Sequence, residues 1–174
     1  KAAETPALDG PFAIEAWVAP QTYPWNWCPI VAQNRDEAAG YYFGLDADGH
    51  VGLLLAVDGQ WKMCVSETRL PLLKWSHVAG TFHPEHGIVV YINGEKSGDL
   101  PVVGKLTSAE DTDLRIARNH NKKPLAHVIR TDYSIPAAYS FDGLLDEIKI
   151  HRGTMNDQAV REAFVSTRPS TDPD

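Results

Sequence analysis

The stretch "SFDGLLDEIKIHR", residues 140–152, is the most informative part of the sequence for predicting the fold class. Successive side chains of a strand point to opposite faces, so the alternation predicts one face that is apolar except for a carboxylate. A carboxylate on an apolar face is costly unless a cation, backbone N–H groups or a metal ion satisfies it. The apolar face would carry Leu144, Asp146, Ile148 and Ile150, and the opposite face Leu145, Glu147, Lys149 and His151.

Most of the remaining chain also consists of short β-rich runs separated by turn signals, which is typical of an all-β sandwich or barrel. Asp58-Gly59 and Asn93-Gly94 lie between such runs and predict tight hairpins. Asn156 follows the last strand and can cap a short helix. The predicted strands are 12–18, 30–33, 41–45, 50–57, 61–66, 74–82, 88–92, 95–100, 114–117 and the opening stretch.

The composition fits one globular domain and argues against two classes of partner. The chain has 174 residues, 43% of them hydrophobic, which is enough for a substantial core. The net charge of −7 argues against nucleic acid, because phosphate binding needs a clustered basic surface. No apolar run approaches the roughly 18 residues of a membrane-spanning helix, so no membrane span is predicted.

Cys28 and Cys64 allow two interpretations. They could form one disulfide in an oxidising compartment, or remain two free thiols that pack as small apolar groups. The second interpretation is favoured, because Cys64 lies within a strand pattern and Cys28 at the edge of a loop.

Five segments, taken in order, resemble the laminin-G-like, concanavalin A-like jelly-roll domains over roughly residues 4–166. They are "FAIEAWVAP" (12–20), "WSHVAGTF" (75–82), "VVYINGEKSG" (89–98), "LRIARN" (114–119) and "FDGLLDEIKIHRG" (141–153). The resemblance implies an all-β, two-sheet antiparallel jelly-roll β-sandwich of about a dozen strands, with a short C-terminal helix. The side chains predicted between the sheets are Phe12, Ile14, Val18, Val90, Ile92, Ile116, Ile148 and Ile150.

The resemblance also suggests how the domain is bounded. The jelly-roll domain is expected over residues 1–166, and the Pro- and Asp-rich residues 167–174 are expected to link it to a following domain. The family usually has one more strand ahead of the segment "ETPALDGPF", so a strand is expected before Lys1.

Domains of this family are mostly extracellular, and in bacteria they commonly accompany glycoside hydrolases or polysaccharide lyases. We therefore expect a secreted, extracellular or periplasmic protein whose partners are a glycan or polysaccharide and a catalytic domain of the same protein. Many members hold one structural calcium ion, for which Asp146 with Asp9 and Asp142 are the candidate ligands. The alternative is that Asp146 accepts backbone N–H bonds or pairs with an arginine.

Aromatic residues in the loop after the first strand predict a ligand-binding surface. Sugars present C–H faces that stack on aromatic rings, and rings on a loop are poorly explained by a core. The alternative is that Trp25 or Trp27 folds back to cover the edge of the sandwich. Trp17, Trp61 and Trp75 lie within or at the start of predicted strands and are expected to be packing residues. The predicted ligand-binding residues are Tyr23, Trp25 and Trp27, with Asn119, His120, Asn121 and Tyr133 supplying polar contacts.

No catalytic residue is predicted. Glycan hydrolysis needs two carboxylates that flank one bond, and alternation points Asp146 and Glu147 to opposite faces. His83 and His86 form an H-x-x-H pair, but zinc needs further ligands that the sequence does not reveal, so an exposed turn is favoured.

The chain is therefore interpreted as a non-catalytic, carbohydrate-binding accessory module. The alternative is a structural spacer or protein-interaction domain that packs on a catalytic neighbour.

Overall fold

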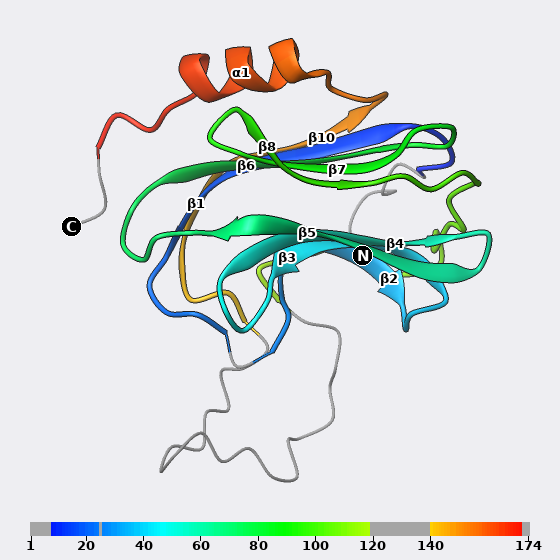
Figure 1. Cartoon of the computed structure of the whole chain (residues 1–174). Coiled ribbons are helices and arrows are strands. Elements are labelled where there is room, and N and C mark those ends of the chain that lie inside the picture. Colours follow the sequence, from blue (N-terminus) through cyan, green and yellow to red (C-terminus); the bar gives the residue numbers. More distant parts are fainter. Residues whose placement is uncertain (1–7, 25, 119–139, 172–174) are drawn as a thin grey trace, which may run out of the picture.

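A computed structural model of the chain describes residues 8–24, 26–118 and 140–171. The described residues form ten strands and one helix, and the strands stack in two layers with the helix on the outside of one layer (Figure 1). The strands are β1 (Phe12–Pro20), β2 (Cys28–Arg35), β3 (Ala39–Leu45), β4 (His50–Val57), β5 (Gln60–Arg69), β6 (Ser76–His83), β7 (Gly87–Ile92), β8 (Glu95–Leu100), β9 (Arg115–Ile116) and β10 (Gly143–Arg152), and the helix is α1 (Asp157–Ser166).

The first sheet has the strand order β10-β1-β6-β7-β8, and the second has the order β5-β4-β3-β2-β9. Every pair of neighbouring strands is antiparallel. The chain crosses between the sheets several times, and the stretch of residues 140–152 becomes β10 at the edge of the first sheet. The predicted two-sheet antiparallel jelly-roll sandwich with a short C-terminal helix is therefore confirmed.

The core lies between the two sheets and holds most of the residues predicted for it. Phe12, Ile14, Val18 and Val90 are fully buried there, and each such side chain contributes about 1.5–3 kcal/mol relative to exposure. Ile92, Ile148 and Ile150 are partly buried against the same cluster. The prediction for Ile116 is wrong, because β9 is a two-residue strand at the sheet edge and leaves this side chain 51% exposed.

The predicted faces of β10 are wrong in their first half, because a β-bulge interrupts the alternation. Glu15 pairs with Lys149 but Trp17 pairs with Asp146, so two residues of β10 lie opposite one residue of β1. Glu147 takes a left-handed φ of 48° at this bulge. In consequence Leu145 packs against the core with Ile148 and Ile150, whereas Leu144 is 50% exposed and Asp146 is also exposed.

The two hairpins predicted from Asx-Gly pairs are present, and their backbone angles explain the residue choice. Asp58 and Gly59 have φ values of 48° and 73°, and Asn93 and Gly94 have φ values of 52° and 82°. Two successive positive φ angles define the turn whose twist matches that of paired strands, and Asn, Asp and Gly tolerate them best.

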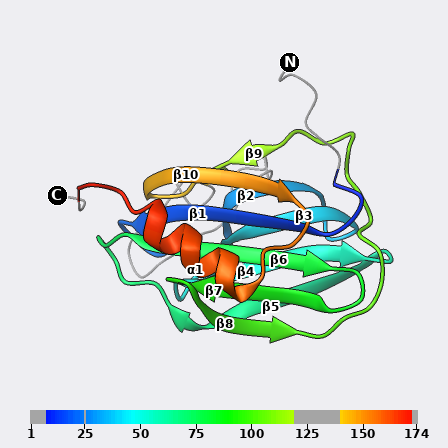
Figure 2. The same ribbon diagram turned by 90° about the horizontal axis from the view of Figure 1, so that it is seen from above.

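Helix α1 lies across the outer face of the first sheet (Figure 2). Asn156 caps it as predicted, because its side chain accepts a hydrogen bond from the Ala159 N–H at 2.9 Å. Phe164 stacks on Trp17 with ring centroids 5.6 Å apart. Beyond the helix, Thr167 and Thr171 accept hydrogen bonds from the indole N–H groups of Trp17 and Trp75, so part of the predicted linker contacts the sandwich.

Both cysteines are buried free thiols, as the favoured interpretation predicts. Burial raises the pKa of Cys28 to about 12 and that of Cys64 to about 11, so both are protonated at neutral pH. Within the described part of the chain, no helix has the length and apolar character that crossing a membrane requires.

Candidate ligand-binding face

The outer face of the second sheet is the strongest candidate for a binding surface. One row of side chains crosses all five strands, since each member lies directly opposite the next in the register. Their neighbours along each strand, including Leu53, Phe43 and Val31, belong to the core, so the row points away from it. The row consists of Met63 on β5, Leu54 on β4, Tyr42 on β3, Ala32 on β2 and Arg115 on β9.

The outer faces of the two sheets are covered by different elements. The one helix among the described residues, α1, packs on the first sheet, and the described strands all lie within the two sheets (Figure 1). On the second sheet, the partly buried indoles of Trp27 and Trp61 pack against Ala32, Tyr42 and Leu54. We call Trp27, Tyr42, Leu54, Trp61 and Arg115 the outer-face cluster.

Trp27 reaches the cluster from the loop just before β2, and a glycine makes room for it. A Cβ atom added to Gly52 would lie only 2.6 Å from the indole of Trp27 and 2.8 Å from the side chain of Leu54. The indole also stands edge-on to the Tyr42 ring, with centroids 6.3 Å apart and planes at 89°. Edge-to-face contacts of this kind orient both rings, so the position of Trp27 on the sheet is specific.

The β9 end of the row is polar. The Arg115 guanidinium donates to the Asn34 backbone oxygen at 3.2 Å and to its side-chain oxygen at 2.9 Å. It also donates to the Asp113 backbone oxygen at 3.4 Å. Burial lowers the pKa of Arg115, and the neighbouring Asp113 and Tyr42 oppose this change, so the group stays cationic at neutral pH. A half-buried cation therefore flanks the aromatic part of the face.

The hydroxyl of Tyr42 lies in the middle of the row. It is buried, and no hydrogen-bond partner for it lies among the residues that the structure describes. Burial raises the pKa of Tyr42 far above its usual range, so the group remains a neutral O–H that can donate and accept. Because the hydroxyl and most of the Tyr42 ring are buried, the surface offered to a ligand consists of the partly buried indoles of Trp27 and Trp61 with Arg115 at one end, and it suits a ligand with C–H faces and hydroxyl groups.

The structure distributes the predicted ligand-binding residues over different surroundings. Trp27 belongs to the outer-face cluster. Tyr23 instead donates its hydroxyl to the Leu70 backbone oxygen at 2.6 Å and packs its ring against Gly49, so it anchors the loop to the β4 side of the sheet. The remaining predicted residues, Trp25, Asn119, His120, Asn121 and Tyr133, lie outside the described residues.

The three predicted calcium ligands are exposed, and two of them accept separate hydrogen bonds. The Asp146 side chain accepts a hydrogen bond from the Glu147 N–H at 2.8 Å, which satisfies the bulge. Asp142 accepts one from the Thr22 hydroxyl at 2.9 Å. Among the described residues, two groups of three His, Cys, Asp or Glu have ligand atoms within 4.8 Å of one another, and neither includes Asp9, Asp142 or Asp146. Their arrangement gives no support to the calcium site, which stays a prediction.

A buried polar network lies on the opposite side of the molecule, under helix α1. Glu15 is 3% exposed and its carboxylate contacts the Nε2 atoms of His77 and His151 at 3.1 and 2.9 Å. Burial alone would raise the pKa of Glu15, but the hydrogen bonds and charges of the two histidines hold it below its usual value. Trp17 and Phe164 lie against the His77 ring, so this network belongs to the helix–sheet contact.

Sequence reasoning missed most of the outer-face cluster. It assigned Trp61 to packing alone and gave no role to Tyr42, Leu54 or Arg115. These residues come from strands distant in sequence, and strand register alone brings them into one row. One signal was available in the sequence. Gly40, Gly44 and Gly52 lie in β3 and β4 on the same face as Tyr42 and Leu54, and glycines within strands often mark a close approach of another group.

The fold defines a class, the concanavalin A-like sandwich. The chain belongs to the concanavalin A-like lectin/glucanases superfamily, whose laminin-G-type family model matches residues 2–161. No curated protein matches the chain in sequence.

Several solved structures share the fold. A heptameric, SAP-like pentraxin from Limulus polyphemus has a TM-score of 0.59 and 18% identity, covering 94% of this chain and 77% of its own. Domain 4 of an extracellular arabinanase from Geobacillus stearothermophilus, solved with arabinotriose, has a TM-score of 0.64 and 17% identity, covering 88% of this chain and 66% of its own.

The binding domain of botulinum neurotoxin serotype G also matches, with a TM-score of 0.64 and 13% identity over 92% of this chain. This chain spans 37% of that neurotoxin domain and just under two thirds of the arabinanase structure. At these identities the matches establish a shared fold.

Proposed function

We propose that this chain is a carbohydrate-binding module whose ligand lies on the outer face of the second sheet. The observation that carries the proposal is the outer-face cluster. Two partly buried indoles, Trp27 and Trp61, lie on a sheet face beside a half-buried cation, Arg115, on the side away from helix α1.

The chemistry of this face suits a sugar better than a purely apolar ligand. Indole rings offer apolar surface to the C–H faces of a pyranose or furanose ring. Asn34 and Arg115 offer amide and guanidinium groups to hydroxyls at the β9 end of the row. Met63, 46% exposed at the β5 end, extends the apolar part beyond the indoles.

The fold relatives support a glycan as the ligand class. The arabinanase domain was solved with arabinotriose, and a botulinum neurotoxin DC binding domain of the same fold was solved with SialylT. These ligands are those of the two named proteins. For this chain, we infer only that the ligand is a glycan or polysaccharide, recognised on the outer-face cluster.

We further infer an accessory role for the module, next to a catalytic domain of the same secreted, extracellular or periplasmic protein. Binding is favoured over catalysis because the two carboxylates of the β10 motif are engaged locally. Asp146 accepts the bulge N–H, and Glu147 pairs with the Lys149 ammonium at 2.8 Å. Glycan hydrolysis needs two carboxyl groups that flank one glycosidic bond, and these two are committed to local partners instead.

A structural spacer or protein-interaction domain is the second candidate, and one observation favours it. The outer face is apolar as well as aromatic, with Met63 and the two indoles partly exposed in one area. A neighbouring domain could cover such a surface, because interface cores are enriched in Trp, Tyr, Met and Arg.

A glycan array with the isolated chain separates the two candidates, followed by titration of the best hit. Trp27→Ala removes a ring from the outer-face cluster, and we expect a loss of about tenfold or more in affinity. Trp75→Ala is the matched control, because Trp75 is also a partly exposed tryptophan but lies beside β6 of the other sheet. Its affinity should equal that of the parent.

Equal affinity in Trp27→Ala, Trp75→Ala and the parent would contradict the proposed site. An array without any hit, together with burial of Trp27 against a neighbouring domain in a longer form of the protein, would support the spacer.

A further inference from the structure

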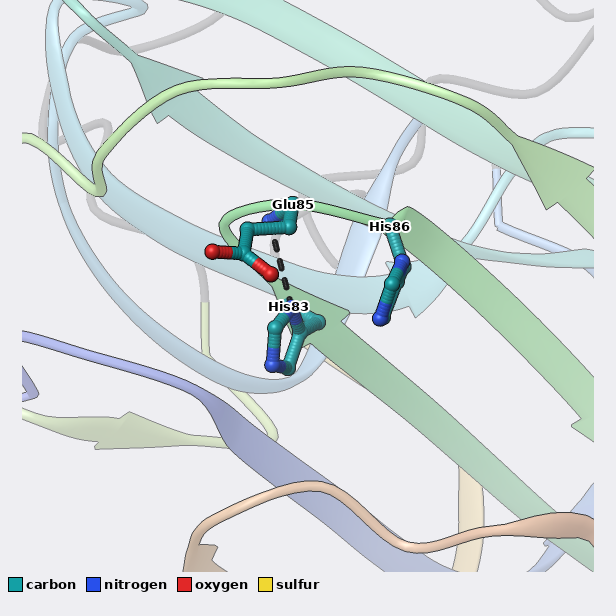
Figure 3. Close-up of side chains that lie close together, drawn as sticks. All are labelled: His83, Glu85 and His86. Carbon is teal, nitrogen blue, oxygen red and sulfur yellow. Dashed lines mark hydrogen bonds between the residues drawn. The ribbon is translucent and has the colours of Figure 1, made fainter.

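The turn between β6 and β7 brings together two imidazoles and a carboxylate from His83, Glu85 and His86 (Figure 3). One ligand atom from each residue lies within 4.8 Å of the other two. The sequence shows the two histidines as H-x-x-H, and the third group comes from between them. We propose that this turn binds a borderline divalent metal ion of the zinc, nickel or copper type.

The ligand set defines the class of metal. Two imidazole nitrogens and one carboxylate oxygen match the donors that zinc and the neighbouring first-row metals prefer, whereas calcium and magnesium prefer oxygen alone. Three protein ligands leave at least one coordination position for water. The site proposed here is therefore open on its solvent side.

Backbone hydrogen bonds fix the turn that carries the three residues before any metal binds. Pro84 fixes its own φ angle, and its backbone oxygen accepts a hydrogen bond from the Gly104 N–H at 2.9 Å. The His86 N–H donates to the His83 backbone oxygen at 3.2 Å and closes the turn. The two imidazole rings stack with centroids 4.5 Å apart and planes at 22°.

Closing the site needs only side-chain rotations. Two ligand atoms on one tetrahedral zinc ion lie about 3.3 Å apart, so the three groups must approach one another by up to about 1.5 Å. Glu85 and His86 are exposed, which leaves room for these rotations. The cost is one hydrogen bond, because His83 Nδ1 accepts the Glu85 N–H at 3.1 Å and ligation by His83 would end this bond. The released N–H can then bond to water.

A second group of the same size shows why this turn is the better candidate. Asp46, Asp48 and His50 also lie within 4.8 Å of one another. However, Asp46 already accepts the N–H groups of Asp48 and His50 at 2.9 and 2.8 Å and contacts the His50 ring at 3.3 Å. This carboxylate therefore serves the hairpin, and His50 supplies the matched control.

Calorimetric titration of the full chain with zinc chloride, and separately with nickel chloride, tests the proposal. We expect one bound ion per chain. His86→Gln should weaken binding about tenfold or more, because it removes one of two imidazole ligands, and Glu85→Gln should weaken it less. His50→Gln should leave the affinity unchanged. Calcium chloride in excess should not compete.

A second readout locates the ion. Sub-stoichiometric copper(II) broadens nearby amide signals in NMR spectra, and we expect selective broadening of residues 83–87. Absence of zinc and nickel binding would overturn the proposal. Unchanged binding in a variant that carries both His83→Gln and His86→Gln, or an equal loss in His50→Gln, would overturn it as well.

Discussion

The indole of Trp27 stands edge-on to the ring of Tyr42, with centroids 6.3 Å apart and planes at 89°. This contact joins a loop residue to the central strand of the second sheet. It fixes the indole on a face that helix α1 does not cover, and the β9 end of this face carries the hydrogen bond between Arg115 and Asn34. The proposed ligand surface depends on this position of Trp27.

Gly52 is expected to be a positioning residue for that surface. Gly52→Ala would place a Cβ atom 2.6 Å from the Trp27 indole, so the ring must move away from the sheet. Since a flexible side-chain end can yield, we expect only about 1 kcal/mol loss of stability but about a tenfold loss of glycan affinity. Urea unfolding and glycan titration measure the two effects.

Gly10→Ala is the control for this variant, because no described residue other than its chain neighbours has an atom within 4 Å of an added Cβ at Gly10. It should change neither quantity. Full glycan affinity in Gly52→Ala would show that the position of the indole does not matter for binding.

The network of Glu15, His77 and His151 predicts a dependence of stability on pH. The pKa of Glu15 is lower in the folded chain than in the unfolded chain, where it is about 4.3. Its contribution is therefore complete above the unfolded value and is lost as the pH falls through the lower, folded value. We expect Glu15→Gln to cost about 1–3 kcal/mol at neutral pH and progressively less below about pH 4.

Urea unfolding of the parent and Glu15→Gln, from about pH 7 to about pH 3, measures this difference. Glu95→Gln, at an exposed site in β8, should show no comparable difference. A difference between the parent and Glu15→Gln that grows towards acid pH would contradict the expected sign.

Substitutions of Asp146 distinguish two roles for its carboxylate, which are accepting a hydrogen bond at the β-bulge and binding calcium. The structure assigns its carboxylate to the Glu147 N–H, and an asparagine oxygen can accept the same bond. Asp146→Asn should therefore be neutral, whereas Asp146→Ala should cost about 0.5–1 kcal/mol at this exposed site. Calcium chloride added to the metal-free parent should leave its melting temperature unchanged. A melting temperature of the metal-free parent that rises with calcium chloride, and equal losses of stability in both variants, would instead support calcium.

Local signals in the sequence predicted much of the fold. Period-two alternation located the strands, and Asp58-Gly59 and Asn93-Gly94 located two hairpins. The bulge at Glu147 was missed because "LLDEIKI" fits an unbroken alternation. That alternation places Leu144 on the core face and Leu145 on the opposite face, which is the reverse of what the structure has. The exposure of Ile116 was missed because it depends on the place of β9 in the sheet.

The candidate site was predictable only in part. Trp27 was identified because an aromatic residue on a loop is unusual. Tyr42 and Leu54 lie in runs, "YYFGL" and "VGLLLAV", whose residues are nearly all apolar or glycine, so nothing local tells which side faces outward. Arg115 joins them only through the pairing of β2 with β9. Strand register, which is a long-range property, assembles the face.

A map of the ligand contact by NMR tests the central claim most directly. The chain is titrated with the best array hit while amide signals are followed. We predict the largest shifts along the outward positions of the second sheet, at Tyr42, Gly44, Gly52 and Leu54, together with the indole N–H of Trp27. Shifts confined to the first sheet and helix α1, or to the turn at residues 83–87, would contradict a ligand site on the outer face.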